Sequence, residues 1–267
     1  MSYIIINKKK YIIKQFGFKG GNNQGYIDYD KKKIGKIIYL SDKRKKDKTL
    51  DTDGYNENPY REIEVHNECN KLIKDKITKH LVKFYKYYVY NNSIILIIDK
   101  YDGDLGSIIN NLTLNELWSI FHQIIITFII LQDKLGFYQG DFGLSNILYK
   151  KVNKTKKYFD YNYNGMKYRI PNEGYEIAIC DYGNVIIDKF ILSDNEIDYY
   201  KENLKKRIEL YEILLLLSKY IRNEEINNII YKNIRFNLFN GIYSINVKYT
   251  NPADPDNILK VFKGIHK

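Results

Sequence analysis

The sequence contains few of the residues that build disulfide-bonded or metal-binding proteins. Only two of its 267 residues are cysteines, Cys69 and Cys180. Two cysteines cannot form a disulfide framework, and the residues around them do not repeat at the spacing of a metal site. We expect both to be small residues of an apolar core.

Segments that would export the chain or carry it through a membrane are also missing. The first ten residues have no secretory apolar region, and the longest apolar run, 124–131, is far shorter than a membrane span. We therefore expect an intracellular, cytoplasmic protein with no membrane insertion.

Proline is rare, with four residues, whereas lysine, isoleucine, asparagine and tyrosine are abundant. This bias is typical of an AT-rich genome, so runs of lysine are weak indicators of function. The net charge of +11 is compatible with polyanionic partners. The basic clusters are scattered, however, and no nucleic-acid-binding module surrounds them, so nucleic acid is not an expected partner.

The hydrophobic content is sufficient for a folded core. Hydrophobic residues make up 44% of the chain, which includes 27 Tyr and 12 Phe, and this excludes global disorder. A length of 267 residues is enough for one large core or for two small lobes that share a cleft.

Two short acidic motifs point to a particular chemistry. Asp141 is followed after four residues by Asn146, and later the apolar segment 177–180 ends at Asp181 in Asp-Tyr-Gly. Phosphoryl transfer needs one carboxylate near the attacking hydroxyl, and an amide plus a second carboxylate to hold Mg²⁺. The two motifs supply these three groups, although each residue alone is also typical of a turn.

The surroundings of the first motif make it more specific. Apolar residues at three- and four-residue spacing predict a buried helix over 114–135. Thr113 and Glu116 predict a capping box at its start, and Gly136 lies at its end. A short strand is expected directly after the motif, at 147–149.

This order of motifs and elements resembles that of the eukaryotic-type protein kinases, in a reduced and divergent form. The resemblance covers 60–188 well and the two ends poorly. It implies an α+β, bilobal fold, with a small β-rich N-lobe containing one helix and a mainly helical, reduced C-lobe. In a single kinase-like domain the N-lobe would span 1–99, the hinge 100–105 and the C-lobe 106–267.

The resemblance also implies roles for the acidic motifs. Asp141 would orient the acceptor hydroxyl and accept its proton, while Asn146 and Asp181 would place Mg²⁺ on the phosphates of ATP. A lysine paired with a glutamate would hold the α- and β-phosphates. The implied activity is transfer of the γ-phosphate of ATP to Ser or Thr hydroxyls of a protein substrate.

Two positions in the chain compete for this lysine. Lys14 ends the second strand of an expected hairpin over 3–16, and Tyr-Ile-Ile-Lys resembles the strand whose lysine binds the phosphates. If the segment 17–25, with its four glycines, is the glycine-rich loop, the lysine must follow at Lys36 or Lys43. Spacing favours the later lysines, whereas local sequence favours Lys14, which we take as the prediction.

The glutamate partner is expected on a helix over 60–74. Glu62 lies in Arg-Glu-Ile, which resembles the start of many such helices, whereas Glu68 is better spaced from the following strand. We prefer Glu62, although either residue is also typical of a solvated helix surface. Further strands are expected at 26–29, 34–41, 82–90 and 94–99.

The nucleotide is expected near the end of the strand over 94–99. The resemblance places Ile98 at the back of its pocket and Asp104 at the mouth. Backbone groups of the hinge, around Asp99 and Tyr101, would bind the adenine edge.

The interval between Asn146 and Asp181 is longer than is usual in kinases. A hairpin insert is expected at about 153–174, since it contains Asn-Gly, a strong two-residue turn. The pattern Y-x-I-P-N-x-G-Y at 168–175 is similar to one in kinase-like proteins of large DNA viruses. The resemblance therefore implies a viral source, and a host cell or virion as the location.

Fewer features are found toward the C-terminus. An amphipathic helix is expected over 204–220, in which Glu209 stands where the central helix of the kinase C-lobe usually has Asp. Further helices are expected over 221–267, with Pro252 and Pro255 marking a turn.

Three departures from the kinase pattern leave the activity open. Gln139 and Gly140 replace the His-Arg that normally precedes the aspartate, and Gly143 replaces a lysine that steadies the γ-phosphate. Control by a phosphorylated activation loop is not expected, because that Arg is the usual phosphate clamp. The alternatives are a pseudokinase that binds proteins, a nucleic-acid-binding protein and a small-molecule phosphotransferase.

Overall fold

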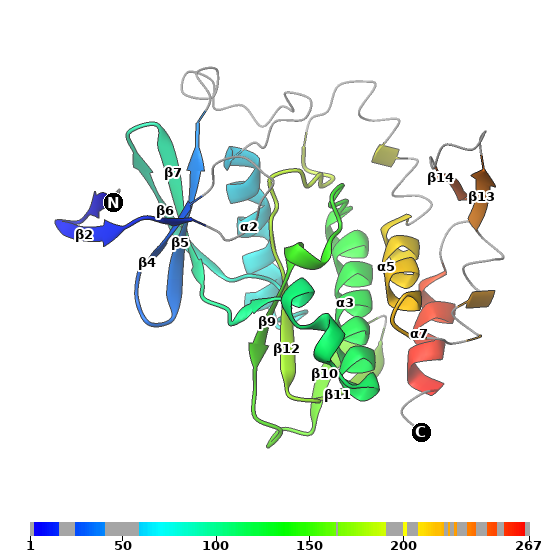
Figure 1. The fold of residues 1–267 in the computed structure, drawn as a ribbon. Helices are drawn as coiled ribbons and strands as arrows, with labels where there is room; N and C mark the ends of the chain where they lie inside the picture. The colour runs from blue at the N-terminus through cyan, green and yellow to red at the C-terminus, as the bar shows by residue number, and fades with distance from the viewer. Residues whose placement is uncertain are drawn as a thin grey trace.

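The computed structural model describes eleven ranges of the chain: 3–15, 25–40, 59–163, 165–190, 200–201, 208–221, 224, 227–228, 234–238, 245–249 and 254–264. The molecule is a mixed α+β protein with small antiparallel sheets. Its longer helices are α2 (Pro59–Lys74), α3 (Leu114–Leu135), α5 (Ile208–Ser218) and α7 (Pro255–Gly264). Figure 1 shows α2 between a strand-rich part and α3, with α5 and α7 beyond α3.

A five-stranded antiparallel sheet, in the order β3-β4-β5-β7-β6, forms the strand-rich part. Its strands are β3 (Lys14–Gln15), β4 (Gly25–Asp28), β5 (Lys33–Tyr39), β6 (Phe84–Tyr90) and β7 (Ser93–Asp99). In β7, Ile94 and Leu96 pack in the core cluster on one face of the sheet, while Ile95 and Ile97 pack in the cluster on the other face. Because both faces are covered, this strand is a continuous apolar run rather than an alternating one.

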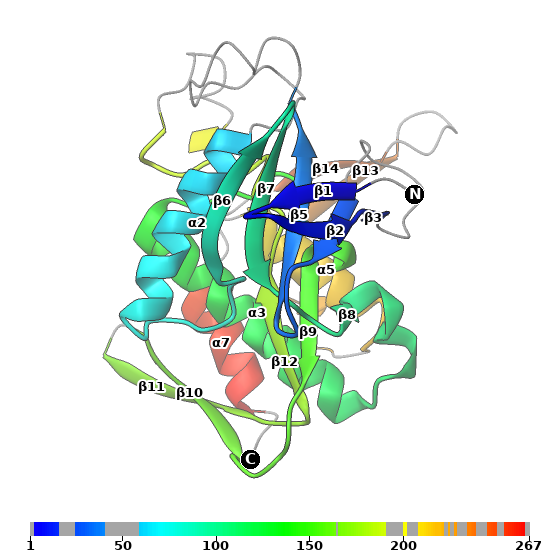
Figure 2. The same cartoon turned by 90° about the vertical axis from the view of Figure 1, so that its left-hand side faces the viewer.

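The outer face of this sheet is covered by a hairpin of β1 (Tyr3–Ile6) and β2 (Lys9–Ile12). Its buried Ile4 and Ile6 join the cluster of the outer face, and Figure 2 shows the hairpin lying across the sheet. The expected hairpin over 3–16 is therefore too long. The chain leaves the hairpin at Ile13, and β3 pairs with β4 instead.

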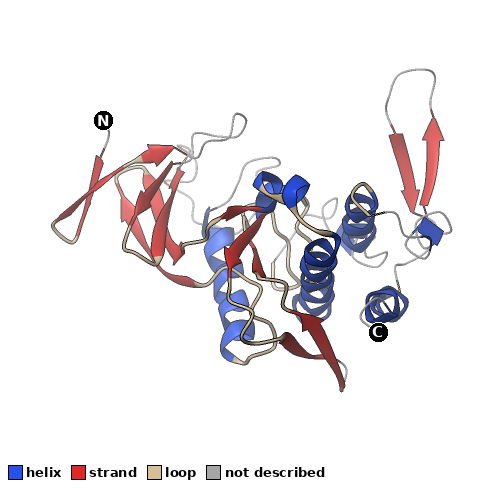
Figure 3. Ribbon diagram, turned by 60° about the horizontal axis from the view of Figure 1, so that its bottom comes forward, coloured by secondary structure: helices blue, strands red, loops and turns tan. Residues whose placement is uncertain are grey.

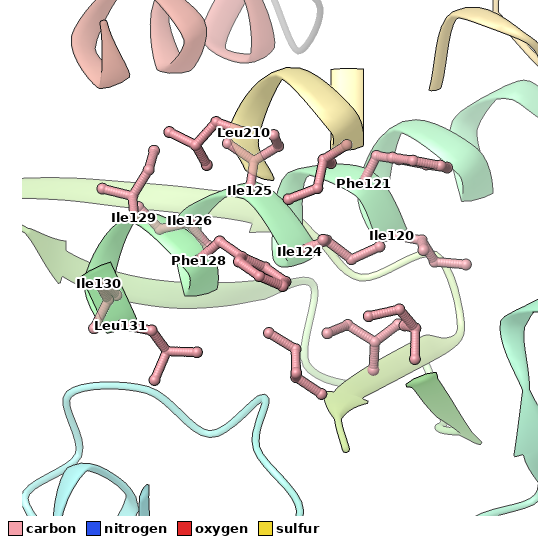
Figure 4. Packing of buried hydrophobic residues seen from close by; sticks show 14 of the residues in the cluster. Ile120, Phe121, Ile124, Ile125, Ile126, Phe128, Ile129, Ile130, Leu131 and Leu210 are labelled. Carbon is pink, nitrogen blue, oxygen red and sulfur yellow. The ribbon is translucent and has the colours of Figure 1, made fainter. Parts of the chain in front are cut away.

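The core of the remaining part is built around α3, whose predicted bounds, capping box and C-terminal glycine are confirmed. Gly136 has φ 59°, and a Cβ at this position would clash with Asp188. Figure 4 shows apolar side chains directed outward around the helix. Within the described ranges α3 is the one helix long and apolar enough to cross a membrane, but 83% of that window is buried. It is a core helix, as the expectation of no membrane insertion requires.

A second sheet, ordered β12-β9-β8, links the segments of the two acidic motifs. Its strands are β8 (Gly103–Asp104), β9 (Ile147–Lys151) and β12 (Tyr175–Ile179). Three 3₁₀ turns flank these elements: η1 (Leu105–Ser107), η2 (Ile109–Asn111) and η3 (Leu144–Asn146). In Figure 3 the strands of the N-terminal part lie on one side of the molecule and α3, α5 and α7 on the other.

The expected insert is a hairpin of β10 (Tyr158–Tyr163) and β11 (Met166–Pro171). Residues of β10 alternate between exposed and buried positions, and buried side chains of both strands join the core around α3. The Ser119 hydroxyl of α3 donates to the Pro171 carbonyl at 2.6 Å. The insert is therefore part of the core rather than a surface appendage.

The C-terminal expectation needs a correction. The helix expected over 204–220 is present as α5 in its described part, and 204–207 lie outside the described residues. Helices alone were expected beyond it, but β13 (Ile234–Leu238) and β14 (Ile245–Tyr249) form an antiparallel hairpin. Both segments alternate apolar and polar residues, which is the period of a strand. Then α7 begins at a proline, which is favoured in the first turn of a helix.

Candidate functional site

One lysine joins three segments that are far apart in the sequence. Lys36 lies on β5, and its Nζ is 2.9 Å from Glu62 Oε1 of α2 and 2.7 Å from Asp181 Oδ1. The side chains of Lys36 and Glu62 are 9% and 1% exposed. A charge this deeply buried requires counter-charges, and the two carboxylates supply them.

The structure contradicts the preference for Lys14 over Lys36, because the side chain that reaches Asp181 is that of Lys36. Lys14 lies on the short edge strand β3, has a half-exposed side chain and pairs with Asp28. Lys36 lies in the central strand β5 and faces α2. Its neighbours at i±2, Ile34 and Ile38, pack in the hydrophobic cluster between the sheet and α2, and side chains two residues apart on a strand share a face. The sequence argument required a lysine at the end of the strand, but the lysine that meets both carboxylates lies inside it. Lys43 and most of the expected glycine-rich loop lie outside the described residues.

Glu62 is the glutamate that meets the lysine, as predicted, and Glu68 forms ion pairs with Lys71 and Lys189 instead. Burial opposes ionisation of Glu62, but the Lys36 ammonium and His66 outweigh it and hold the pKa of the carboxyl below its usual value. Glu62 therefore stays charged.

Asp181 has an uncommon backbone conformation. Its φ is +62°, in the left-handed region that Asp and Asn tolerate better than most residues. The side chain is 34% exposed, so one carboxylate oxygen binds Lys36 while the group remains in contact with solvent. Strained backbone of this kind is concentrated at functional sites.

The register of β9 and β12 brings the second acidic motif to the first. Ile147 pairs with Ile179, and the Cys180 N–H donates to the Asn146 carbonyl at 2.9 Å, so Asp181 follows directly beside Asn146. The Asn146 amide nitrogen donates to the Asp141 backbone carbonyl at 2.8 Å. Because its nitrogen is engaged, the orientation of the Asn146 amide is fixed, while the Asp141 side chain is exposed.

A buried glutamate of α5 fixes the backbone in front of Asp141. Glu209 Oε1 accepts the N–H groups of Gln139 at 2.5 Å and Gly140 at 3.1 Å. Burial raises the pKa of Glu209 to about 8, although these two backbone hydrogen bonds oppose the shift. The sequence indicated only that Glu209 replaces an aspartate, not that it holds this loop.

Gln139 connects the two acidic motifs directly. Its side-chain nitrogen donates to the carbonyl of Cys180 at 3.1 Å, one residue before Asp181. The sequence indicated only that Gln139 stands where kinases usually have a histidine. Its amide instead forms a hydrogen bond that fixes the spacing between the two loops.

A chain of aromatic rings runs from the five-stranded sheet to α3, and the sequence did not predict it. Phe84 stacks on His66 at 5.2 Å, His66 meets Tyr182 edge-on at 4.7 Å, and Tyr182 meets Phe137 at 6.2 Å. Phe137 in turn contacts Phe128 of α3 at 6.0 Å. The fully buried Tyr182 also donates its hydroxyl to the Ile179 carbonyl at 2.6 Å. The residue after Asp181 is thereby packed between α2 and α3.

Comparisons with known proteins assign no family. No protein-family model and no curated protein matches the sequence. The function of the site is therefore inferred from its residues.

The residues expected around the nucleotide lie at the junction of the two sheets. Ile98 is buried in the cluster that faces α2. The Asp99 carboxylate accepts the Tyr85 hydroxyl and pairs with Lys150, and the Asp99 N–H donates to a neighbouring carbonyl. The carboxylate and the N–H of Asp99 therefore hold this segment in place and do not provide a free group for binding adenine.

Tyr101 and Asp104 lie further along the same segment. The Tyr101 ring is covered by the Lys150 ammonium at 4.3 Å. Within the part of the chain that the structure describes, no hydrogen bond from the Tyr101 N–H is found. Asp104 caps η1 by accepting the Ser107 N–H at 3.0 Å.

The possible metal ligands around Asp181 suit Mg²⁺ only when the ion is bound together with a nucleotide. Among the described residues, no cluster of three or more His, Cys, Asp or Glu side chains is suited to a metal ion. Mg²⁺ commonly binds through one or two carboxylates and completes its shell with substrate phosphates and water. Asn146 and Asp181 supply one amide oxygen and one carboxylate, so they fit Mg²⁺ bound together with a nucleotide.

Proposed function

We propose that the chain is an ATP- and Mg²⁺-dependent protein kinase with a bilobal, protein-kinase-like fold. The N-lobe would span 1–99, the hinge 100–105 and the C-lobe 106–267, with the β10–β11 hairpin as its insert. The observation that supports this best is the contact of Lys36 with both Glu62 and Asp181. A lysine on a sheet strand, paired with a helix glutamate and directed at the second acidic motif, is the arrangement that kinases use to hold ATP phosphates.

Each polar residue has a role in this proposal. Lys36 binds the α- and β-phosphates and is itself positioned by Glu62. Asn146 and Asp181 bind Mg²⁺, which neutralises charge on the phosphates during transfer. Asp141 orients the acceptor Ser or Thr hydroxyl of a protein substrate and accepts its proton. The rate would come mainly from positioning and charge stabilisation.

The nucleotide base would lie between the two lobes. Ile98 would form the back of its pocket, and the Tyr101 N–H would donate to the edge of the adenine ring. Leu148 and Cys180 pack against the hydrophobic cluster that contains Ile98. Asp104 would lie at the mouth of the pocket.

A second candidate is a pseudokinase that binds nucleotide or protein partners without turnover. It is favoured by Gly140 and Gly143, which leave the loop around Asp141 without the Arg and Lys side chains of ordinary kinases. The two candidates share the nucleotide site and differ in whether phosphate is transferred.

Transfer of radiolabel from γ-labelled ATP to a protein acceptor tests the proposal. Asp141→Asn removes the carboxylate from an exposed side chain, so folding should be preserved while transfer falls by at least about a hundredfold. Asp160→Asn, an equally exposed change on β10, is the matched control and should retain full activity. Equal rates for Asp141→Asn and the wild type would contradict the proposal.

Mg²⁺–ATP binding separates the two candidates. A thermal shift on adding Mg²⁺–ATP, with no labelled product from protein or small-molecule acceptors, would identify a pseudokinase. Salt-sensitive binding to nucleic acid that ATP does not affect would instead indicate a nucleic-acid-binding protein.

A further inference from the structure

The segment that follows Asp181 holds the helix that carries Glu62. The Lys189 ammonium forms ion pairs with Glu64 and, at 3.0 Å, with Glu68, both on the same side of α2. The two carboxylates are only 24% and 13% exposed, whereas Lys189 is 53% exposed. Partly buried carboxylates that share one cation interact more strongly than an isolated surface pair.

A second contact lies next to this ion-pair cluster. The Arg61 guanidinium is 4.9 Å from the centre of the Phe190 ring. Both side chains are buried, with 1% and 7% exposed, so this cation–π contact is largely shielded from water. Arg61 directly precedes Glu62, so Phe190 packs against the turn of α2 that presents the glutamate.

The same segment is fixed at its other side to the residues in front of Asp141. Tyr138 and Ile186 exchange two backbone hydrogen bonds, each of 2.9 Å, and the Asp188 N–H donates to the Leu135 carbonyl at 2.9 Å. Lys189 and Phe190 are therefore attached to a rigid support. A contact from this support to α2 links the position of the helix to that of the catalytic loop.

The two ends of α2 are held differently. Near the C-terminal end, the Asn70 amide forms hydrogen bonds with both the N–H and the carbonyl of Phe84 on β6. The N-terminal half is held by Lys36 through Glu62, and by Lys189 and Phe190. Loss of the last two contacts would remove the links between this half and the segment after Asp181, while the Lys36 ion pair and the packing of Ile63 and His66 would remain.

We propose that Lys189 and Phe190 are positioning residues that keep α2 docked, so that Lys36, Glu62 and Asp181 meet without a phosphate group on the chain. This inference rests on the proposed function for its effect on ATP, but the docking of α2 is measurable without ATP. In place of an Arg next to Asp141 that clamps a phosphorylated loop, the chain uses its own glutamates and a lysine. Treatment of the active protein with a phosphatase should leave its activity unchanged.

Charge reversal and charge swapping test the contact of Lys189 with Glu64 and Glu68, which we call the tether. Lys189→Glu places a third carboxylate beside Glu64 and Glu68. We expect backbone amides of the N-terminal half of α2 to exchange hydrogen at least about fivefold faster in the nucleotide-free protein, because the undocked state becomes more populated. The Kd for Mg²⁺–ATP should rise by a similar factor, since only the docked fraction binds.

Reversing the partners should restore the contact. In the quadruple variant Glu64→Lys, Glu68→Lys, Lys71→Glu and Lys189→Glu, which also reverses the Lys71 partner of Glu68, exchange in α2 and the Kd for Mg²⁺–ATP should return to within about twofold of the wild type. Lys154→Glu disrupts the ion pair of Lys154 with Glu173, whose exposures of 60% and 29% are similar. This control should change neither measurement.

The outcomes separate the inference from the proposed function. Unchanged exchange in α2 for Lys189→Glu, or no recovery in the swapped variant, would overturn the tether. Faster exchange with recovery, in a protein that never binds Mg²⁺–ATP, would support the tether and refute the kinase assignment. Loss of activity on phosphatase treatment would contradict a phosphate-independent assembly.

Discussion

At the scale of single residues, the site is organised around one ammonium group between two carboxylates. Lys36 is buried where its pairing with Glu62 must compensate for the loss of hydration. Such a pair gives little net stability compared with apolar residues, but removal of one partner leaves an uncompensated charge. The buried position of Lys36 therefore points to a role in binding rather than in folding.

Replacement of Lys36 by methionine should weaken nucleotide binding. We expect Lys36→Met to weaken Mg²⁺–ATP binding by at least about tenfold, because the phosphates lose their cation. The free energy of unfolding should fall by roughly 3 kcal/mol, since the buried Glu62 carboxylate loses its ammonium partner. Calorimetric titration and urea denaturation measure the two effects.

The matched control is Lys14→Met, which removes an exposed lysine from the same sheet. It should change the affinity for Mg²⁺–ATP less than twofold and the stability by less than about 1 kcal/mol. An equal loss of affinity in both variants would show that Lys36 is not the phosphate-binding lysine.

At the scale of elements, the insert hairpin completes the core beside α3. It lies between the two acidic motifs in the sequence, so an insert of this length must fold without separating Asn146 from Asp181. It does so because β9 and β12 still pair directly, while β10 and β11 leave and return at the far end of that pair. The buried face of the hairpin then packs against the core around α3.

Truncation of a buried hairpin residue should destabilise the whole protein. Ile170 is fully buried on β11, so Ile170→Ala should lower the free energy of unfolding by about 3 kcal/mol. Lys167→Ala, on the exposed face of the same strand, should cost less than about 0.5 kcal/mol. Urea denaturation gives both values. If the two variants were equally stable, the hairpin would not belong to the core.

At the scale of the whole molecule, one connection runs from the five-stranded sheet to α3, and another runs from α5 to the loop before Asp141. The aromatic chain from Phe84 to Phe128 passes through α2 and the residue after Asp181. Glu209 joins α5 to the loop before Asp141. Both connections link the core to the residues that we propose as catalytic, so stability and site geometry are coupled.

Glu209 should make global stability depend on pH. Its pKa is about 8 in the folded protein and near its ordinary 4.5 when unfolded. Because the folded pKa is raised, its contribution is fully present below about pH 4.5 and is lost as the pH rises through about 8. Glu209→Gln keeps the acceptor for the two N–H groups but does not titrate. Between pH 5 and 8 we expect the free energy of unfolding of the wild type to fall by on the order of 3 kcal/mol more than that of Glu209→Gln.

Urea denaturation at several pH values measures this difference, and other titrating groups cancel between the two proteins. Parallel stability curves for the wild type and Glu209→Gln would mean that the glutamate does not titrate in this range.

Much of the local structure followed from the sequence alone. The bounds and caps of α3 follow from its apolar spacing, Thr113, Glu116 and Gly136, because a capping box and a left-handed glycine act within one turn. A hairpin is likewise present within the expected insert, and Glu62 meets a buried strand lysine, although that lysine is Lys36 rather than Lys14. The contacts between distant motifs also agree with their expected order, since Asn146 contacts both the Asp141 carbonyl and Cys180, the residue before Asp181.

The tertiary structure decided what depends on burial and on long-range contact. Lys14 and Lys36 are both strand lysines in the sequence, and only the order of strands shows that one is at an edge and the other faces α2. The roles of Gln139, Glu209 and Lys189 were likewise hidden, because their partners lie far away in the chain. Local sequence fixes periodicity and caps, whereas the partner of a charged or polar group is set by which elements the fold brings together.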